Sequence, residues 1–300
     1  MSALTPEPAP LPAAPAPLGE VLERVSDTLA AAGILDARID AEWLVGHVLD
    51  LGRGAVQAAE ITGAALSAAQ LAALAPLVQR RAAREPLQHI TGTAAFRQLL
   101  LHVGPGVFVP RPETEGVVQF AIDALRAEAS PAPIGVDLGT GSGAIALAMA
   151  TEVPNARIFA AENSPEAFTW TRRNFDAVAA PNATLVFADL ADAFAELAGT
   201  VDVVISNPPY VPDDAVPRDP EVRDYDPAVA LYGGPDGLGV VRVLSRVALR
   251  LLRPGGVLII EHGELQGRAI RELLAADGWR ASATHPDLTL RDRATTALRP

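Results

Sequence analysis

Cysteine and lysine are both absent from the 300 residues, and no apolar run is long enough to cross a membrane. Without cysteine, disulfide bonds, zinc–thiolate sites and thiol nucleophiles are excluded, which agrees with a reducing cytoplasm. The basic side chains are all arginine, a bias that we attribute to a GC-rich coding sequence rather than to function. The start of the chain also lacks the charged-then-apolar order of a signal peptide. We therefore expect a cytoplasmic protein.

A net positive charge is lacking too, because the formal net charge at pH 7 is -12. This acidic balance opposes a protein that holds DNA or RNA by neutralising many phosphates, so we expect no stable nucleic-acid partner. The sequence has no H-E-x-x-H or other recognisable ligand cluster, and we expect no metal. The apolar content of 49% is enough to bury the core of one large domain or two modest ones.

The N-terminal third divides by composition into a tail and a helical region. Residues 1–17 alternate proline and alanine with almost no charge, a composition that cannot bury a core, and we expect a disordered tail there. Helical spacing of apolar residues begins at Leu18 and predicts a small helical domain over residues 18–95, with Ser67 as one N-cap. We interpret the run "RRAARE" at residues 80–85 as a solvated helix face.

The remaining sequence begins with an alternating stretch and continues as strand-like runs separated by helical segments. "AFRQLLLHVGPGVFVP" breaks at Gly104–Gly106, which predicts a β-hairpin linker over residues 96–112. The order over residues 113–300 predicts an α/β domain with a mostly parallel sheet, whose ligands should lie at the carboxyl ends of the strands. The strands that we expect are "IGVDLG", "ARIFAAE", "ATLVFAD", "VDVVISN", "GVLIIEHG" and "TTALRP".

The first of these strands leads directly into a glycine-rich turn and a helix. Glycine lets the backbone approach a ligand closely, and the helix N-terminus adds oriented N–H groups, so a nucleotide-like cofactor fits here. The turn lacks the Lys and Ser/Thr of a P-loop, and Asp137 before it would repel a pyrophosphate but suit the cationic groups of S-adenosylmethionine. An ordinary tight turn is the alternative. The turn residues are Gly139, Thr140, Gly141, Ser142 and Gly143.

Acidic residues end the next two expected strands. Glu162 ends the second strand, where its carboxylate can accept hydrogen bonds from both hydroxyls of a ribose. Asp189 ends the third strand and is placed to meet an adenine ring, with Leu190 beside it. Each acid taken alone is more often a cap or a solvated charge. Together with the glycine-rich turn, they predict one cofactor crevice.

The fourth expected strand ends in Asn207, Pro208, Pro209 and Tyr210. The Asn207 side-chain carbonyl and the Pro208 backbone carbonyl offer two acceptors for one planar NH₂ group, on which Tyr210 can stack. The prolines stiffen the turn, so the acceptors need little reorganisation. Because an amide or aryl amine nitrogen is a poor nucleophile, acceptors on its hydrogens would favour its attack on a methyl group. A stiff turn that only ends the strand is the alternative.

At this point the chain resembles the class I S-adenosylmethionine-dependent methyltransferases, and within them the HemK/PrmC family that methylates release-factor glutamines. The resemblance covers nearly everything after the tail. "NPPY" is shared with adenine and cytosine amino methyltransferases, whereas "PRPETE" and "ALYGGPDGL" are far more specific. The motifs that carry it are "REPLQHITG", "FVPRPETE", "DLGTGSGAIAL", "NSPEA", "VVISNPPYVP", "DPAVALYGGPDGL", "LRPGGVLIIEHGELQG" and "DLTLRDR".

The resemblance implies a Rossmann-like, mostly parallel seven-stranded sheet, joined by the hairpin to a small N-terminal helical domain that grips a protein substrate. It implies methyl transfer from S-adenosyl-L-methionine, leaving S-adenosyl-L-homocysteine, to the amide nitrogen of the glutamine in the Gly-Gly-Gln motif of class I peptide-chain release factors.

By motif match, the glycine-rich turn and Glu162 would hold the cofactor, Asp189 and Leu190 would flank its adenine, and Asn207–Tyr210 would hold the glutamine, with Asn207 also at the cofactor. Relatives often have an aromatic residue where Leu190 stands, and Asp is also usual where Glu162 stands.

Two residues of "PRPETE" have two interpretations. Arg111 and Glu113 lie where the hairpin enters the catalytic domain, so they could line the cofactor pocket and order it as substrate binds. The segment could instead be a rigid linker followed by a helix N-terminus, where acidic residues favour the helix dipole.

Two rival functions are an adenine amino methyltransferase acting on DNA or RNA and a non-catalytic protein that binds S-adenosylmethionine. The acidic balance and the lack of an evident target-recognition domain oppose the first. The complete "NPPY" motif opposes the second, because a binding-only protein has no need of acceptors for an amine. We expect a monomer whose partners are release factors.

Overall fold

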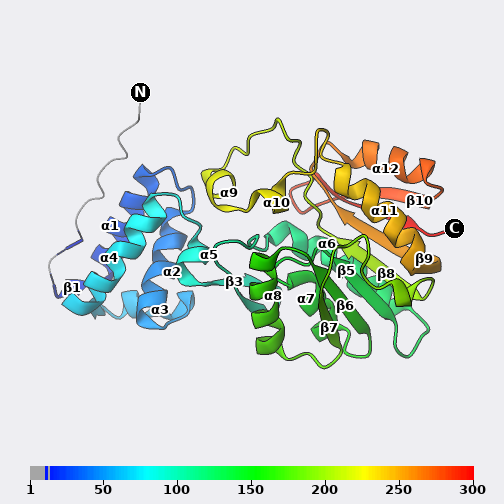
Figure 1. Ribbon diagram of the computed structural model, residues 1–300. Helices are drawn as coiled ribbons and strands as arrows, with labels where there is room; N and C mark the ends of the chain where they lie inside the picture. Colours follow the sequence, from blue (N-terminus) through cyan, green and yellow to red (C-terminus); the bar gives the residue numbers. More distant parts are fainter. Residues whose placement is uncertain (1–10, 13) are drawn as a thin grey trace. The chain divides into compact units, whose positions relative to one another are not determined.

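The computed structural model describes residues 11–12 and 14–300. The chain divides into two compact units, and most of their helices and strands are labelled in Figure 1. The first unit comprises the described residues up to Gly92 together with Arg218–Tyr225, and the second comprises Thr93–Pro217 and Asp226–Pro300. No helix among the described residues is both long and apolar enough to span a membrane.

The first unit is built from short helices. Its helices are α1 (Leu18–Ala31), α2 (Ala37–Leu49), α3 (Arg53–Ile61), α4 (Ala68–Ala82), α5 (Leu87–Thr91) and α9 (Pro220–Tyr225). The Ser67 side chain accepts a hydrogen bond from the backbone of Gln70 at the start of α4, which confirms the predicted N-cap. Most of the tail predicted at residues 1–17 lies outside the described residues. The predicted C-terminal end of the tail, at residue 17, was wrong, because β1 (Ala16–Pro17) pairs with β2 (Ala65–Leu66) and Ala16 is buried.

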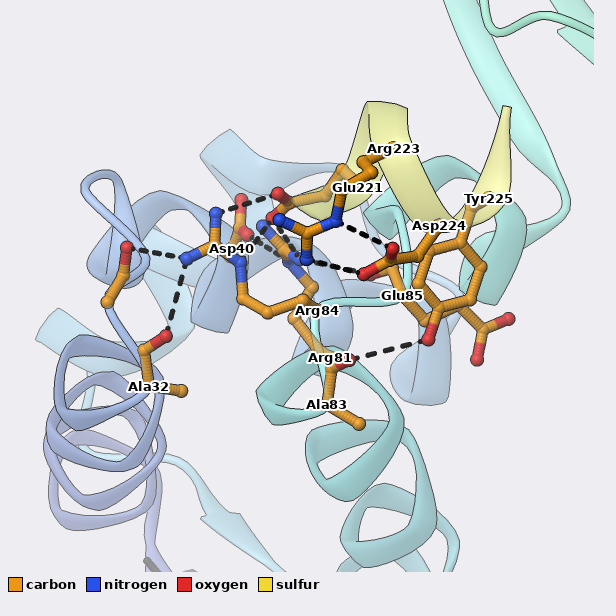
Figure 2. A network of polar contacts seen from close by, with 11 residues as sticks. Ala32, Asp40, Arg81, Ala83, Arg84, Glu85, Glu221, Arg223, Asp224 and Tyr225 are labelled. Carbon is orange, nitrogen blue, oxygen red and sulfur yellow. Dashed lines mark hydrogen bonds and ion pairs between the residues drawn. The ribbon is translucent and has the colours of Figure 1, made fainter. Parts of the chain in front are cut away.

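The predicted solvated face at residues 80–85 is also wrong in part, as Figure 2 shows. Arg81 is buried, and its guanidinium donates to Asp40 Oδ2 over 2.7 Å and to Glu221 Oε1 over 2.8 Å. Arg84 forms a bidentate ion pair with the same Glu221 carboxylate, with distances of 2.8 Å from Nε to Oε1 and 2.7 Å from Nη2 to Oε2. Paired donors and acceptors compensate for the loss of water around these charges. The partner Glu221 lies in α9, so the sequence around the arginines gave no sign of it.

The second unit contains a seven-stranded sheet in the order β10-β11-β9-β8-β5-β6-β7. Strands β5 to β9 run parallel, and at one edge β11 pairs antiparallel with β9 and β10 pairs antiparallel with β11. This confirms the predicted fold class and adds β10, a polar strand that is not among the six strands expected from the sequence. The sheet strands are β5 (Ile134–Leu138), β6 (Arg157–Glu162), β7 (Ala183–Phe187), β8 (Val201–Ser206), β9 (Leu252–Glu261), β10 (Arg280–Pro286) and β11 (Asp292–Leu298).

Helices cover both faces of this sheet. Residues of α6 and α7 pack with Val203 and Ile205 of β8 in one buried cluster. Residues of α11 and α12 pack with Val204 of the same strand in a second cluster. Both faces of β8 are therefore buried, as its unbroken apolar sequence predicts. The helices are α6 (Pro112–Ala127), α7 (Ala144–Glu152), α8 (Pro165–Val178), α10 (Ala228–Leu231), α11 (Gly239–Leu251) and α12 (Gly267–Ala276), with a 3-10 turn, η1 (Ala195–Leu197).

The hairpin lies earlier than predicted. Strands β3 (Thr93–Phe96) and β4 (Leu99–His102) pair with Phe96 opposite Leu99, so the turn is at Arg97 and its neighbour, and Arg97 has a φ of 52°. Gly104–Gly106 follows the hairpin instead of forming its turn. The glycine is required there for another reason, because a Cβ on Gly104 would lie 2.4 Å from the Trp170 ring.

Candidate active site

The parallel strands bring the predicted site residues to one edge of the sheet. Strands β5, β6, β7, β8 and β9 all run in the same direction, so their carboxyl ends share that edge. The side chains and turns found there are the glycine-rich turn after β5, Glu162 at the end of β6, Asp189 after β7, Asn207 after β8 and Glu261 at the end of β9. Four of these five strand ends were identified from the sequence, and Glu261 was missed.

The glycine-rich turn between β5 and α7 has a backbone that other residues adopt only under strain. Gly139 and Gly141 have φ values of 74° and 58°, and nothing lies within 4 Å of the Cβ that either would carry, so both border open space. Asp137 is fully buried and accepts hydrogen bonds from Thr140 Oγ1 (2.5 Å) and the Ala146 N–H (3.2 Å). Burial raises the pKa of Asp137 to about 7. In the structure this carboxyl group therefore stabilises the turn from behind.

Glu162 stands beside that turn and organises its backbone. One carboxylate oxygen accepts from the Gly141 N–H over 2.8 Å, and the other accepts from the N–H groups of Asn163 (3.0 Å) and Ser164 (2.8 Å). Each carboxylate oxygen has two lone pairs, so acceptor capacity remains for a ligand hydroxyl. Asp189 is exposed and accepts from the Asn163 side chain, while Leu190 is half-buried against the sheet.

The Asn207 side chain lies between two strand ends. Its Nδ2 group donates to Glu261 Oε1 over 3.0 Å, and Thr114 Oγ1 donates to the same oxygen over 3.1 Å. Glu261 and Thr114 are both buried, whereas Asn207 is half-buried. Thr114 belongs to "PRPETE" and Glu261 to "IIEHG". The rule that picked out Glu162 and Asp189, an acid at a strand end, could have found Glu261 as well.

A glycine-rich segment supports the backbone that follows Asn207. The Gln266 side chain donates to the Tyr210 carbonyl over 2.9 Å. A Cβ on Gly233 would lie 2.3 Å from the Pro209 carbonyl oxygen, and a Cβ on Gly237 would lie 2.2 Å from that of Tyr210. Gly233 and Gly237 of "ALYGGPDGL" are therefore required by close approach to the "NPPY" turn, which places the two motifs in direct contact.

Arg111 and Glu113 have different surroundings. Arg111 forms an ion pair with Asp226 over 2.5 Å, and its guanidinium lies 4.7 Å from the centre of the Phe108 ring. Burial raises the pKa of Asp226 to about 6, although the Arg111 charge opposes this rise. Glu113 is exposed in the first turn of α6, where acidic residues favour the helix dipole. Neither residue is hydrogen-bonded to Asn207, whereas Thr114 of the same motif donates to Glu261, the acceptor of the Asn207 side chain.

Both ring nitrogens of His262 have hydrogen-bond partners. His262 is buried, and its ring nitrogens are hydrogen-bonded to the Gly263 carbonyl (2.9 Å) and to Thr295 Oγ1 (2.8 Å). Within residues 11–12 and 14–300, no three His, Cys, Asp or Glu side chains are grouped closely enough to hold a metal ion.

Comparison with known proteins assigns both parts of the chain. Residues 20–92 match the PrmC N-terminal domain, and residues 99–219 match the methyltransferase small domain. A release factor glutamine methyltransferase of Streptomyces coelicolor is 48% identical over 282 residues, which cover 93% of this chain and 97% of that protein. The protein of the same description from Bifidobacterium longum is 46% identical over 91% of this chain and 97% of its own length.

Two further similarities are to proteins of other descriptions. A 4-amino-L-phenylalanine/4-methylamino-L-phenylalanine methyltransferase of Streptomyces pristinaespiralis is 38% identical over 94% of this chain and 95% of that protein. The crystal structure of the hMettl16 catalytic domain in complex with a 3'UTR hairpin matches with a TM-score of 0.52 and 15% identity, over 66% of this chain and 75% of that one. This second similarity shows the fold alone.

Proposed function

Since the chain belongs to the family of release factor glutamine methyltransferases, we propose that it transfers a methyl group from S-adenosyl-L-methionine to the glutamine side chain of the Gly-Gly-Gln motif in class I release factors. The observation that carries the proposal is the Asn207 side chain, whose amide nitrogen is engaged by Glu261. Its carbonyl oxygen therefore points away from that carboxylate and can accept from an NH₂ group.

The glycine-rich turn and its neighbours suit the cofactor. The open space beside Gly139 and Gly141 can admit a ligand to the backbone N–H groups of the turn. Glu162 can accept from a ribose hydroxyl while it keeps the turn in place, and Asp189 and Leu190 can flank the adenine. S-adenosylmethionine would supply an electrophilic methyl group. We assign no pyrophosphate contact, because the buried Asp137 carboxyl group lies directly behind the turn.

The "NPPY" turn would hold the substrate amide. Asn207 Oδ1 and the Pro208 carbonyl accept from the two N–H bonds of the glutamine NH₂ group, and Tyr210 packs on its flat face. These acceptors would stabilise the positive charge that builds on nitrogen as its bond to the methyl group forms and the bond between that methyl group and the cofactor's sulfur breaks. The nitrogen would then lose one of its two protons to restore the neutral amide. The hydrogen bond from Gln266 and the tight packing of Gly237 keep the turn rigid, so little reorganisation is needed during transfer.

The other predicted substrate residues act less directly in this proposal. Arg111 orders the pocket through its ion pair with Asp226, which joins "PRPETE" to the segment that ends in the supporting glycines. Glu113 is free to meet the protein substrate at the surface. The first unit, which matches the PrmC N-terminal domain, would add further contacts to the release factor. A cytoplasmic location follows from such a partner.

The second candidate substrate is an aryl amine. The relative of Streptomyces pristinaespiralis, named for methylation of 4-amino-L-phenylalanine, matches this chain over 94% of its length. Its substrate has a planar, delocalised nitrogen like that of an amide, and the same two acceptors would serve it. We rank the release factor glutamine first because this chain is 48% identical in sequence to the release factor enzyme and 38% identical to the 4-amino-L-phenylalanine enzyme.

The experiment offers all the amine classes to the purified protein. Labelled S-adenosylmethionine is incubated with an unmethylated release factor, with a copy whose Gly-Gly-Gln glutamine is changed to alanine, with 4-amino-L-phenylalanine and with DNA and RNA. We expect label on the unaltered release factor alone. Label on the amino acid or on nucleic acid, with none on the release factor, would reject the proposal.

A further inference from the structure

The carboxyl group of Glu261 is a buried acid that the mechanism above does not use directly. It stands at the end of β9, with 2% of the residue exposed. Its Oε1 atom accepts from Asn207 Nδ2 and from Thr114 Oγ1, whereas Oε2 is buried and has no hydrogen-bond partner among the described residues. Leaving a charged oxygen without a partner is costly, which makes a purely structural role a poor explanation.

The position of Glu261 follows from the register of the sheet. Strands β8 and β9 pair in parallel, with Ser206 opposite Ile260. Asn207 directly follows Ser206, and Glu261 directly follows Ile260. The register of the two strands therefore places the Glu261 carboxyl group next to the Asn207 side chain. Thr114 approaches from α6 and fixes the carboxyl group from a second element.

The contact determines which way the Asn207 amide faces. The two ends of an asparagine side chain have nearly the same shape, so their hydrogen-bond partners decide the orientation. An ionised carboxylate can only accept, so it binds the NH₂ end and turns the carbonyl oxygen away from itself. The opposite orientation would set two acceptors against each other and present donors to a substrate that also donates.

We propose that Glu261, held by Thr114, is a positioning residue that keeps the Asn207 carbonyl oxygen turned toward the substrate amine. This inference rests on the proposed function only in that Asn207 receives an amine. It applies equally to a glutamine amide and to an aryl amine.

The proposal has a pH signature. Burial raises the pKa of Glu261 to about 7, the Thr114 hydrogen bond and the charges of Arg293 and Arg111 lower it, and the charge of Glu113 raises it. Once protonated, the carboxyl group can donate to the Asn207 carbonyl oxygen and so stabilise the wrong orientation. The rate of the chemical step is therefore expected to fall as the pH drops through about 7.

The test compares Glu261→Gln with wild type under single-turnover conditions, with calorimetric measurement of cofactor affinity. Gln accepts or donates with equal ease, so it no longer selects one orientation of Asn207. We expect a loss of about 10- to 100-fold in the rate, with cofactor affinity within about 2-fold of wild type, because a small misplacement of a catalytic group has this cost. The fall in rate near pH 7 should disappear in the variant.

The controls separate positioning from folding. Glu264→Gln removes an exposed carboxylate just after β9 and should leave the rate and the pH profile unchanged. Thr114→Ser retains the hydroxyl donor and should keep the wild-type rate and pH profile. Thr114→Val lacks that donor and should have a lower rate of methyl transfer.

An unchanged rate and pH profile in Glu261→Gln would overturn the proposal, as would a loss that is matched by lost cofactor affinity. If wild type methylates an amine other than the release factor glutamine, the proposed substrate fails, and the same variants are then measured with that amine.

Discussion

Replacing Gly237 with alanine should damage the amine-binding turn from outside it. The added Cβ would lie 2.2 Å from the Tyr210 carbonyl oxygen and 2.7 Å from Gln266 Nε2, the group that donates to that oxygen. Gly237 also has a φ of 70°, a conformation that costs an L-residue about 1–2 kcal/mol. Overpacking against fixed backbone adds about 1–3 kcal/mol.

Gly234→Ala is the matched control for this substitution. Gly234 has a φ of 91°, but nothing lies within 4 Å of its Cβ position. Gly234→Ala should therefore lower the free energy of unfolding only by the cost of the backbone conformation, about 1–2 kcal/mol. The difference in melting temperature between the two variants then measures the steric contribution of the Gly237 Cβ to the loss of stability, at about 2–4 °C for each kcal/mol.

The assay is the rate of methyl transfer at saturating cofactor, measured beside thermal unfolding. Gly237→Ala should lose about 10-fold or more in rate, because the displaced Tyr210 carbonyl shifts the turn that carries Asn207, while Gly234→Ala should retain most of the wild-type rate. Equal rates in the two variants, with equal melting temperatures, would refute the claim that Gly237 is required by contact with the turn.

Three further predictions concern the site acids and Asn207. Asn207→Ala should reduce the transfer rate by roughly 100-fold with cofactor affinity nearly unchanged, measured by single-turnover kinetics and calorimetry. Glu162→Ala should weaken cofactor binding by about 10-fold or more, because charged hydrogen bonds contribute about 1.5–3 kcal/mol, and calorimetry without release factor measures this. Glu261→Gln should raise the unfolding free energy at pH 8 by about 1–3 kcal/mol. Because the pKa of Glu261 is raised in the folded protein, its carboxyl group contributes stability that is fully present below about pH 4.5 and is lost as the pH rises through about 7. Chemical denaturation at both pH values tests this last prediction, and the gain should vanish at pH 4.5.

The fold could be predicted from the sequence wherever a strand was apolar and ended in a glycine or a polar residue. Strand β8, "VDVVIS", is buried at every position and was easy to identify. Strand β10, "RASATHP", was missed because its residues are mostly exposed or half-buried polar ones that carry no alternating pattern. Strand β10 is stabilised by its pairing with β11 at the sheet edge, a long-range effect that local sequence does not show.

The hairpin and the arginine cluster were mispredicted for related reasons. Glycines at Gly104–Gly106 suggested a turn, but Gly104 is required by the approach of the Trp170 ring, while the actual turn uses Arg97 with a positive φ. The burial of Arg81 depends on Glu221, which is 140 residues away in the chain. Such contacts are fixed by tertiary packing and leave no local signature.

The site itself divides in the same way. The polar residues at the ends of β5, β6, β7 and β8 could be found one by one, because parallel strands place their carboxyl ends at one edge. Asn207 is oriented by its donation to Glu261, and Glu261 in turn accepts a hydrogen bond from Thr114, so the orienting residues lie in two other elements. The sequence therefore predicted which groups can meet the ligands but not which groups hold them in place.

Identifying the methylated atom decides whether the protein modifies the release factor glutamine. The wild-type protein is incubated with S-adenosylmethionine and an unmethylated release factor, and the products are digested and sequenced by tandem mass spectrometry. We expect one added methyl group on the glutamine side chain of the Gly-Gly-Gln peptide and none elsewhere. A methyl group on another residue, or an unmodified glutamine beside methylated 4-amino-L-phenylalanine, would contradict this expectation.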